Sequence, residues 1–143
     1  MRAGAPPVRA GLLLVGAGAA LGGPARHLLD TAVGSTTPSG HLPWGTFTVN
    51  VLGALLLGLL VTWAGHRRRL LLLLGTGFLG AFTTFSSLAL QVVQLSGDGR
   101  EALAAGYAVV SLVTGLLAAW AGTLVGPGLP SAGVTAPDDE DPR

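Results

Sequence analysis

The sequence predicts an all-α integral membrane protein with four transmembrane helices. Half of its 143 residues are hydrophobic, the mean hydropathy is +0.63, and only 10% of the residues are charged. An ordinary soluble domain carries about 25% charged residues. So few charged side chains cannot cover the surface of a soluble protein of this size, and the composition therefore argues against a soluble enzyme.

The charges also avoid the apolar part of the chain. Between residues 10 and 95 they are confined to Arg26, Asp30 and the run 67–69, whereas acidic residues gather at the carboxyl terminus. There is no cysteine, which excludes a disulfide framework, a thiolate metal site and a cysteine nucleophile. Long uncharged apolar runs are what a lipid bilayer requires of a helix that crosses it.

Four apolar stretches are long enough to cross a hydrocarbon core of about 30 Å, which takes about 20 helical residues. They cover residues 10–29, 46–63, 70–95 and 102–125. We therefore expect an N-terminal segment over 1–9 and a four-helix transmembrane domain over 10–125. Residues 126–143 are rich in Pro, Gly, Ser and acidic side chains without apolar periodicity, which predicts a disordered acidic tail.

The first apolar stretch has two other interpretations. Arg2 and Arg9 precede an apolar run that ends in small residues, as in a secretory signal peptide, but the apolar character continues to residue 29 and three further stretches follow. The glycines of 16–22 imitate a dinucleotide-binding loop, but their spacing differs and no βαβ unit follows. We expect instead that Gly18 and Gly22 form a small-residue face on which another helix packs.

The third stretch combines glycines with hydroxyl side chains at its middle. These residues are Gly75, Gly77, Gly80, Thr83, Thr84, Ser86 and Ser87. One interpretation is a continuous, flexible helix whose hydroxyls bond back to the preceding turn. The other is a broken helix whose freed carbonyls bind an ion, as in transporters. The spacing alone does not decide between them.

Three motifs, taken in order, resemble the Fluc (CrcB) family of fluoride channels. Segment 75–87, GTGFLGAFTTFSS, is similar to the family's third-helix motif, and segment 43–53, PWGTFTVNVLG, to its second-helix motif. Segment 22–26, GGPAR, resembles the first-helix Gly…Arg pair. The resemblance extends over about residues 11–125, with four short spans in both cases.

This resemblance implies a dimer of two four-helix subunits in opposite membrane orientations, with two fluoride pores along the interface. It also implies a broken third helix and one structural sodium ion at the dimer centre, held by the backbone carbonyls that match Gly80 and Thr83. The residues it assigns to the fluoride pathway are Asn50, Phe85, Ser86, Ser87, Tyr107 and Ser111.

These side chains suit an anion that holds its water tightly, because a pore must replace that water with donors or positive potential. An amide offers two N–H donors, a hydroxyl offers one, and an aromatic ring offers its electropositive edge. A polar side chain such as Asn50 on an apolar membrane helix costs free energy, so we expect it to have a specific role. The alternative is that Asn50 bonds a neighbouring helix, a contribution of about 0.6 kcal/mol. For Ser111, an ordinary small residue at a helix contact is as good an interpretation as a residue of the fluoride pathway.

Two positions depart from the family pattern in the third stretch. Leu88 stands where the second pore phenylalanine is expected, and Gln91 stands where an acidic residue often follows. In the fourth stretch Gly115 lacks the hydroxyl expected there. Leucine has no electropositive ring edge, so Leu88, together with Gln91, supports an alternative, a non-conducting or partner-dependent subunit of a heterodimer.

The resulting hypothesis is a passive channel in the cell (inner) membrane that exports cytoplasmic fluoride, without enzymatic or nucleic-acid function. The partner would be a second copy or a homologous subunit of opposite orientation in the bilayer. Five arginines, at positions 2, 9 and 67–69, lie on the side of both termini, against Arg26 and Arg100 on the other side. This bias predicts cytoplasmic termini and one main orientation. It favours a homologous partner that restores an aromatic ring at the position of Leu88.

Overall fold

The computed structural model describes residues 7–34 and 42–126, and every regular element in these two ranges is a helix. Four spans are long and apolar enough to cross a membrane, as predicted: Val8–Val33, Trp44–Ala64, Arg68–Gly97 and Glu101–Val125. They extend slightly beyond the predicted apolar stretches, because helical hydrogen bonding continues into flanking polar residues. Apart from Gly126, the predicted disordered tail over 126–143 lies outside the described residues, as does most of the N-terminal segment.

The third span consists of several elements, whereas the other three are single helices. The elements are α1 (Val8–Val33), α2 (Trp44–Ala64), α3 (Arg68–Leu70), η1 (Leu71–Leu79), α4 (Gly80–Phe82), α5 (Phe85–Gly97) and α6 (Glu101–Val125). η1 is a π-helix, a wide winding that is rare beyond a single turn and common at functional sites. Between α4 and α5 the helix is interrupted at Thr83 and Thr84.

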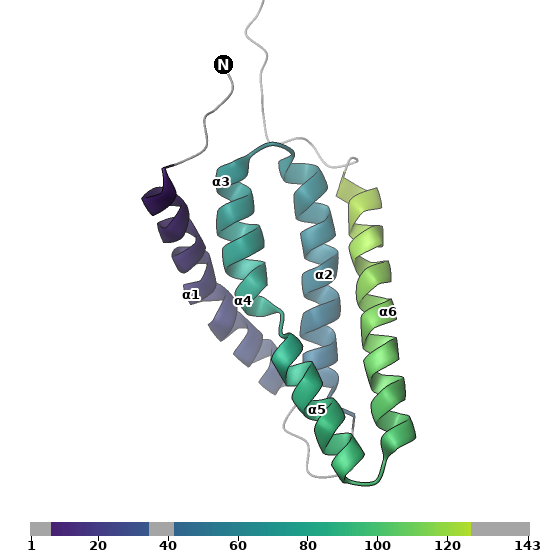
Figure 1. Cartoon of the computed structure of the whole chain (residues 1–143). Coiled ribbons are helices and arrows are strands. Elements are labelled where there is room, and N and C mark those ends of the chain that lie inside the picture. Colours follow the sequence, from purple (N-terminus) through teal and green to yellow (C-terminus); the bar gives the residue numbers. More distant parts are fainter. Residues whose placement is uncertain (1–6, 35–41, 127–143) are drawn as a thin grey trace, which may run out of the picture.

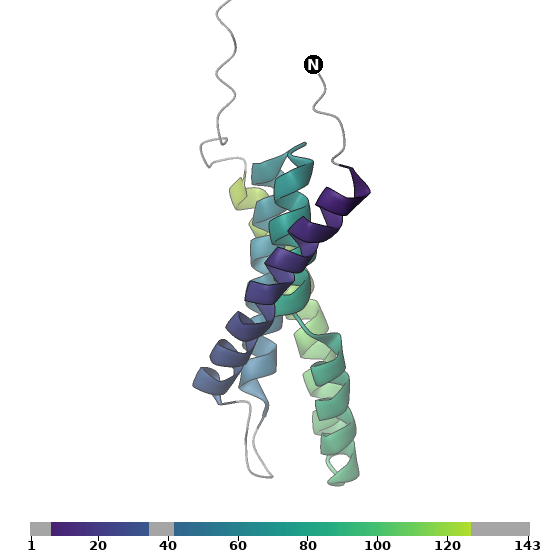
Figure 2. The same cartoon turned by 90° about the vertical axis from the view of Figure 1, so that its left-hand side faces the viewer.

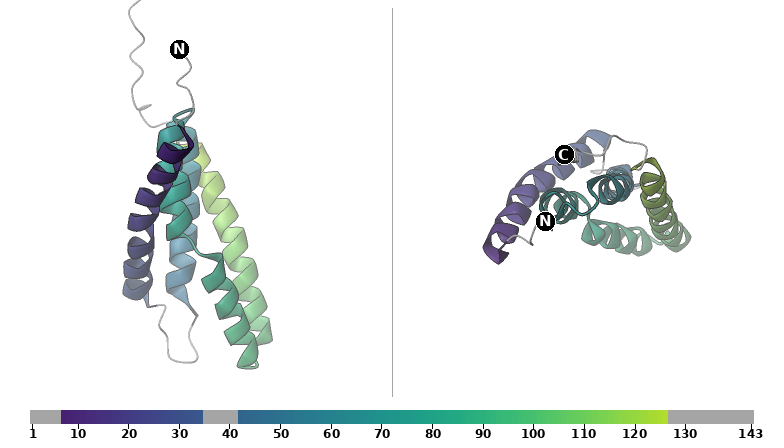
Figure 3. Two further views of the ribbon diagram at one scale, coloured as in Figure 1. Left: turned by 60° about the vertical axis from the view of Figure 1, so that its left-hand side comes forward. Right: turned by 90° about the horizontal axis from the view of Figure 1, so that it is seen from above.

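The four spans lie side by side, with α1 and α6 at opposite ends of the row and the third span and α2 between them (Figure 1). Spans that follow one another in the chain run in opposite directions, so in the row α1 runs parallel to the third span and α2 runs parallel to α6. The start of α1 and the end of α6 lie at the same end of the molecule. α5 leaves the row after the interruption, so that α1 and α5 diverge toward the opposite end (Figure 2). Seen from above, the helices form a curved layer, with α5 displaced to one side of it (Figure 3).

Glycines allow close approach at two helix pairs. A Cβ atom at Gly18 or Gly22 of α1 would collide with the backbone of η1 at Leu73 and Phe78. The predicted packing role of Gly18 and Gly22 is therefore confirmed, and α1 packs on η1 through it. Glycines 58 and 122 have the same role between α2 and α6, where an added Cβ would meet the backbone of the facing helix.

Few side chains are fully buried within the single chain. Val49 and Thr46 are completely enclosed, whereas Leu13, Phe85 and Leu116 are among many large apolar side chains that are more than two-thirds exposed. Such a surface is far more apolar than that of a soluble monomer. It suits a multi-pass membrane protein, whose outer surface faces lipid or another subunit.

Candidate functional site

The interruption of the third span is the most irregular feature of the transmembrane region. Thr83 (φ −79°, ψ 158°) and Thr84 (φ −149°, ψ 116°) both have extended backbone. Thr84 then caps α5, because its Oγ1 accepts a hydrogen bond of 3.2 Å from the N–H of Ser87. Extended backbone at membrane depth leaves polar groups that must find partners within the protein.

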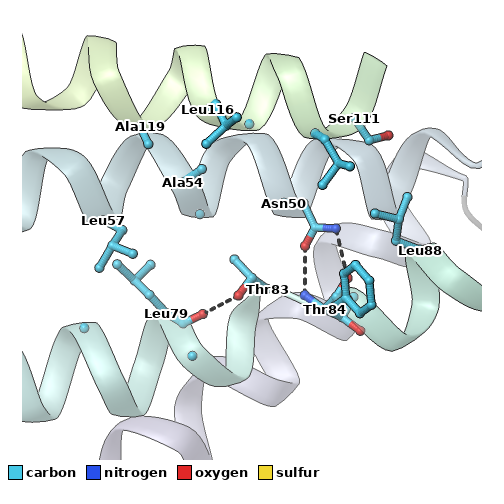
Figure 4. A pocket seen from close by; sticks show the side chains of 16 residues that line it. Asn50, Ala54, Leu57, Leu79, Thr83, Thr84, Leu88, Ser111, Leu116 and Ala119 are labelled. Carbon is cyan, nitrogen blue, oxygen red and sulfur yellow. Dashed lines mark hydrogen bonds between the residues drawn. The ribbon is translucent and has the colours of Figure 1, made fainter. Parts of the chain in front are cut away.

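The side chain of Asn50 on α2 supplies two of those partners. Its Nδ2 donates to the carbonyl of Thr84 at 2.9 Å, and its Oδ1 accepts from the N–H of Thr84 at 2.8 Å (Figure 4). Turning the amide over would place donor against donor and acceptor against acceptor, so this pairing defines the orientation of the side chain. One N–H of Nδ2 is used in the pair, and the second is left for another acceptor.

Two backbone carbonyls lose their helical donors at the interruption. In an unbroken α-helix the N–H of Thr84 would donate to Gly80, and the N–H of Ser87 would donate to Thr83. Instead, the first N–H bonds to Asn50 and the second to the Thr84 hydroxyl. The carbonyls of Gly80 and Thr83, the two positions matched to the sodium site, therefore lack the donors that would occupy them in a helix.

A groove of about 430 Å³ runs along the interruption between α2, α4, α5 and α6. Its lining is mostly apolar, and its polar or functional positions include Asn50, Gly80, Thr83, Thr84, Phe85 and Ser111 (Figure 4). Five of the eight predicted site residues, all but Ser86, Ser87 and Tyr107, thus line one groove. The structure brings these five together from three of the four spans.

Two groove residues differ sharply in exposure. Phe85 is 75% exposed in the single chain, so its side chain is accessible to an ion or to another subunit. Ser111 is only 6% exposed, and its Oγ has no hydrogen-bond partner among the described residues. A buried hydroxyl without a partner costs free energy, so the Ser111 hydroxyl is available to bond a water molecule or an ion in the groove.

Ser86 and Ser87 lie beside the groove at the start of α5 and do not belong to its lining. The Thr84 hydroxyl lies 3.2 Å from Ser86 Oγ and donates to Ser87 Oγ at 3.1 Å. These contacts join the three hydroxyls into a cap for the helix. Thr83 is separate from this cluster, because its hydroxyl donates back to the carbonyl of Leu79 at 3.0 Å.

Tyr107 belongs to a second polar cluster at the end of the molecule that contains the start of α2. Its hydroxyl donates to Gln91 Oε1 at 3.0 Å and lies 3.2 Å from the carbonyl of Pro43. Gln91 Nε2 in turn donates to Thr46 Oγ1 at 2.7 Å. Sequence reasoning missed Thr46, although its position one helical turn before Asn50 places both side chains on the same face of α2.

Leu88 has a packing role that its sequence position did not reveal. It is only 6% exposed and belongs to an apolar cluster with Leu95, Ala104 and Tyr107 between α5 and α6. It also forms part of the groove lining. The leucine therefore fills the contact between these two helices at the place where a second ring was expected.

Carbonyl oxygens are the best candidates for cation ligands in the described part of the chain. Residues 7–34 and 42–126 contain no group of three His, Cys, Asp or Glu side chains that could hold a metal ion. Backbone carbonyls of unwound helices coordinate sodium in other membrane proteins. The freed carbonyls of Gly80 and Thr83 fit that type of ligand.

These features define a small multi-pass α-helical membrane protein with one group of polar residues at an interruption within one span and a second group near the start of α2. The sequence profile of the family described as "CrcB-like protein, Camphor Resistance (CrcB)" matches residues 13–123. The chain belongs to this family.

Three relatives have names that state a function. The chain is 38% identical over 115 residues to the fluoride-specific ion channel FluC 1 of Ligilactobacillus salivarius, covering 80% of this chain and 98% of that protein. It is 44% identical to FluC 2 of Moorella thermoacetica, covering 78% and 93% of the two chains. It is also 44% identical to FluC of Paracoccus denitrificans, covering 82% and 94%. Both of these are likewise named fluoride-specific ion channels.

Proposed function

We propose that this protein is a fluoride channel subunit through which cytoplasmic fluoride leaves the cell passively. The support is the similarity to relatives named fluoride-specific ion channels, which extends over about four-fifths of the chain. A channel of this family is not an enzyme and needs no catalytic residue. The same similarity favours a conducting channel over the non-conducting subunit that Leu88 and Gln91 suggested.

The observation that carries the proposal is the groove at the interruption between α4 and α5. The α5 helix begins there, and the positive end of a helix dipole attracts anions. Asn50 has one N–H left to donate, Phe85 presents an exposed ring, and Ser111 has an unused hydroxyl. We place the fluoride pathway along these three residues, since donors and ring edges can replace the water of a small anion.

Ser86, Ser87 and Tyr107 remain part of the proposed pathway with a supporting function. The Ser86 and Tyr107 hydroxyls donate to neighbouring groups in the isolated chain, so each would have to exchange a protein partner for the ion. Ser87 Oγ accepts from the Thr84 hydroxyl and keeps its own hydrogen, but it lies outside the groove lining. We propose that Asn50, Phe85 and Ser111 contact fluoride directly. The three hydroxyls would then act at the margins of the pathway.

A structural sodium ion is the second part of the proposal. The negative end of the helix that stops at Phe82 favours a cation, and Gly80 and Thr83, whose carbonyls lack their helical donors, both line the groove. Two carbonyls from one chain are too few to coordinate sodium. A second subunit related by a two-fold axis would bring two more to the same point, because such an interface places identical residues opposite each other.

The proposed assembly is therefore a dimer of oppositely oriented subunits in the cell (inner) membrane. The exposed apolar side chains around the groove, such as Phe85 and Leu116, would be covered by the second subunit. That subunit is either a second copy or a homologue. The arginine bias of the loops favours the homologue, because one strongly biased sequence does not insert equally both ways.

Fluoride efflux from liposomes tests this proposal directly. The chain is reconstituted alone, and then together with a homologous subunit of opposite arginine bias, and efflux of fluoride and of chloride is recorded. We expect fluoride efflux well above that of protein-free liposomes, with little chloride efflux. Absence of fluoride efflux in both preparations, with folded protein in the bilayer, would contradict the channel function.

A further inference from the structure

We infer that Asn50 is a positioning residue for the sodium site, because its side chain keeps the Gly80 carbonyl out of the helical hydrogen-bond ladder. This inference rests on the sodium site proposed above. It adds a function to Asn50 that differs from donating to fluoride. The two functions use different atoms of the same amide.

One backbone N–H, that of Thr84, has two competing acceptors, the Gly80 carbonyl and Asn50 Oδ1. The N–H of Thr84 is the helical donor for the Gly80 carbonyl, and it bonds instead to Asn50 Oδ1 at 2.8 Å. A backbone N–H has one hydrogen and makes one strong bond. As long as Asn50 holds this N–H, the Gly80 oxygen keeps its lone pairs for another positive partner.

The second hydrogen bond of the pair prevents the peptide of Thr84 from rotating back. Asn50 Nδ2 donates to the Thr84 carbonyl at 2.9 Å, so the peptide is held at both of its polar atoms. One helical turn further along α2, Gly53 lets the Thr83 side chain pack directly on the helix, since a Cβ there would collide with the Thr83 methyl group. α2 therefore holds both extended residues in place.

The Thr83 carbonyl is freed by a similar exchange within the third span. Its helical donor, the N–H of Ser87, bonds to Thr84 Oγ1 at 3.2 Å. Both candidate sodium ligands thus depend on a side chain that captures the competing N–H. Removal of either side chain would let the N–H return to the carbonyl and rewind the helix by one residue.

Different atoms of the Asn50 amide serve the sodium ion and the fluoride ion. Oδ1 holds the N–H that competes for the cation ligand, whereas the unused N–H of Nδ2 is the atom offered to fluoride. Aspartate, held in its neutral form by the apolar surroundings, keeps an oxygen acceptor for the Thr84 N–H and one O–H donor for the Thr84 carbonyl, but lacks the second N–H that Asn50 offers to fluoride. Asn50→Asp is therefore expected to separate sodium binding from fluoride passage, and Asn50→Leu to abolish both.

The experiment measures sodium binding without relying on transport. The purified full-length chain, alone and then together with a homologous subunit of opposite arginine bias, is heated at increasing sodium concentrations. N-methyl-D-glucamine keeps the ionic strength constant, and the concentration giving half of the rise in Tm is recorded. Native protein is compared with Asn50→Leu, Asn50→Asp and Gln94→Leu. The last is a matched control that removes an exposed amide from α5.

We expect Asn50→Leu to raise the half-maximal sodium concentration at least about tenfold, as loss of a supporting residue does at other metal sites. Asn50→Asp should bind sodium at least as well as the native chain and lose fluoride efflux. Gln94→Leu should match the native chain in both measurements. A native sodium response in Asn50→Leu, or loss of the response in Asn50→Asp, would overturn the inference.

A second pair of variants covers the case in which Asn50→Leu does not fold. Thr84→Val removes the hydroxyl that holds the Ser87 N–H, and Thr84→Ser retains it. We expect a weaker sodium response in the valine variant alone, and equal responses in the two would contradict the account. If the native chain shows no sodium response either alone or with the homologous subunit, the sodium site and this inference are both wrong, while fluoride efflux separately decides the channel function.

Discussion

The side-chain amide of Asn50 and the peptide of Thr84 form a reciprocal pair of hydrogen bonds, at 2.9 and 2.8 Å. This pair supplies hydrogen bonds to the N–H and the carbonyl of Thr84 at the one place where the third span is not helical. A polar group without a hydrogen bond in the hydrocarbon core costs several kcal/mol of free energy. One asparagine on a neighbouring helix thus allows extended backbone at a depth where lipid alone would exclude it.

Removal of sodium should destabilise the assembled protein. A ligand that binds only the folded state at a hundred times its Kd contributes about 2.7 kcal/mol. We expect the free energy of unfolding to fall by about this amount when N-methyl-D-glucamine replaces a saturating concentration of sodium, and to recover when sodium is restored. Equilibrium unfolding in detergent, read by tryptophan fluorescence, measures it. Identical unfolding curves in both buffers would speak against a structural ion.

Gly58→Ala should weaken the contact between α2 and α6. The added methyl group would meet the backbone of Ala119, and overpacking of a close contact costs about 1–3 kcal/mol. Gly106→Ala is the matched control, because nothing lies within 4 Å of a Cβ at that position in the chain. The two variants are compared by equilibrium unfolding. Equal stabilities would show that the close approach at Gly58 is not required.

The Gln91–Tyr107 contact should appear as a coupling energy between α5 and α6. The Tyr107 hydroxyl donates to Gln91 at 3.0 Å, and such bonds inside membrane proteins contribute about 0.6 kcal/mol. Unfolding of Gln91→Leu, Tyr107→Phe and the double variant gives the coupling directly. We expect the effects of the two single changes to be non-additive by about this amount. Simple additivity would mean that the two side chains do not interact.

The sequence was sufficient to predict the four spans and the packing role of Gly18 and Gly22, because length, hydropathy and small-residue spacing are local properties. It did not predict the partner of Asn50, since the Thr84 peptide is 34 positions away and a peptide group has no residue-specific signal. The same holds for the bond between Gln91 and Thr46. For Leu88, the sequence indicated only a missing ring, whereas its burial between α5 and α6 depends on tertiary packing.

Membrane orientation gives an independent test of the partner. Five arginines on the side of the termini against two on the other should hold both termini in the cytoplasm. A topology reporter fused after Arg143 should therefore give a mainly cytoplasmic signal when the chain is expressed alone. Near-equal cytoplasmic and external signals would instead favour a dimer of two identical, oppositely oriented copies.

The fluoride pathway itself is tested most directly by efflux through two variants of the groove. Liposomes containing the native chain, Asn50→Leu, Phe85→Ile or the Gln94→Leu control are loaded with fluoride, and its release is followed with a fluoride electrode. Loss of the amide donor in Asn50→Leu should reduce efflux at least a hundredfold, a barrier increase of about 2.7 kcal/mol. Phe85→Ile should also reduce efflux strongly, and the control should conduct normally. Native efflux rates in both groove variants would contradict the assignment of the pathway.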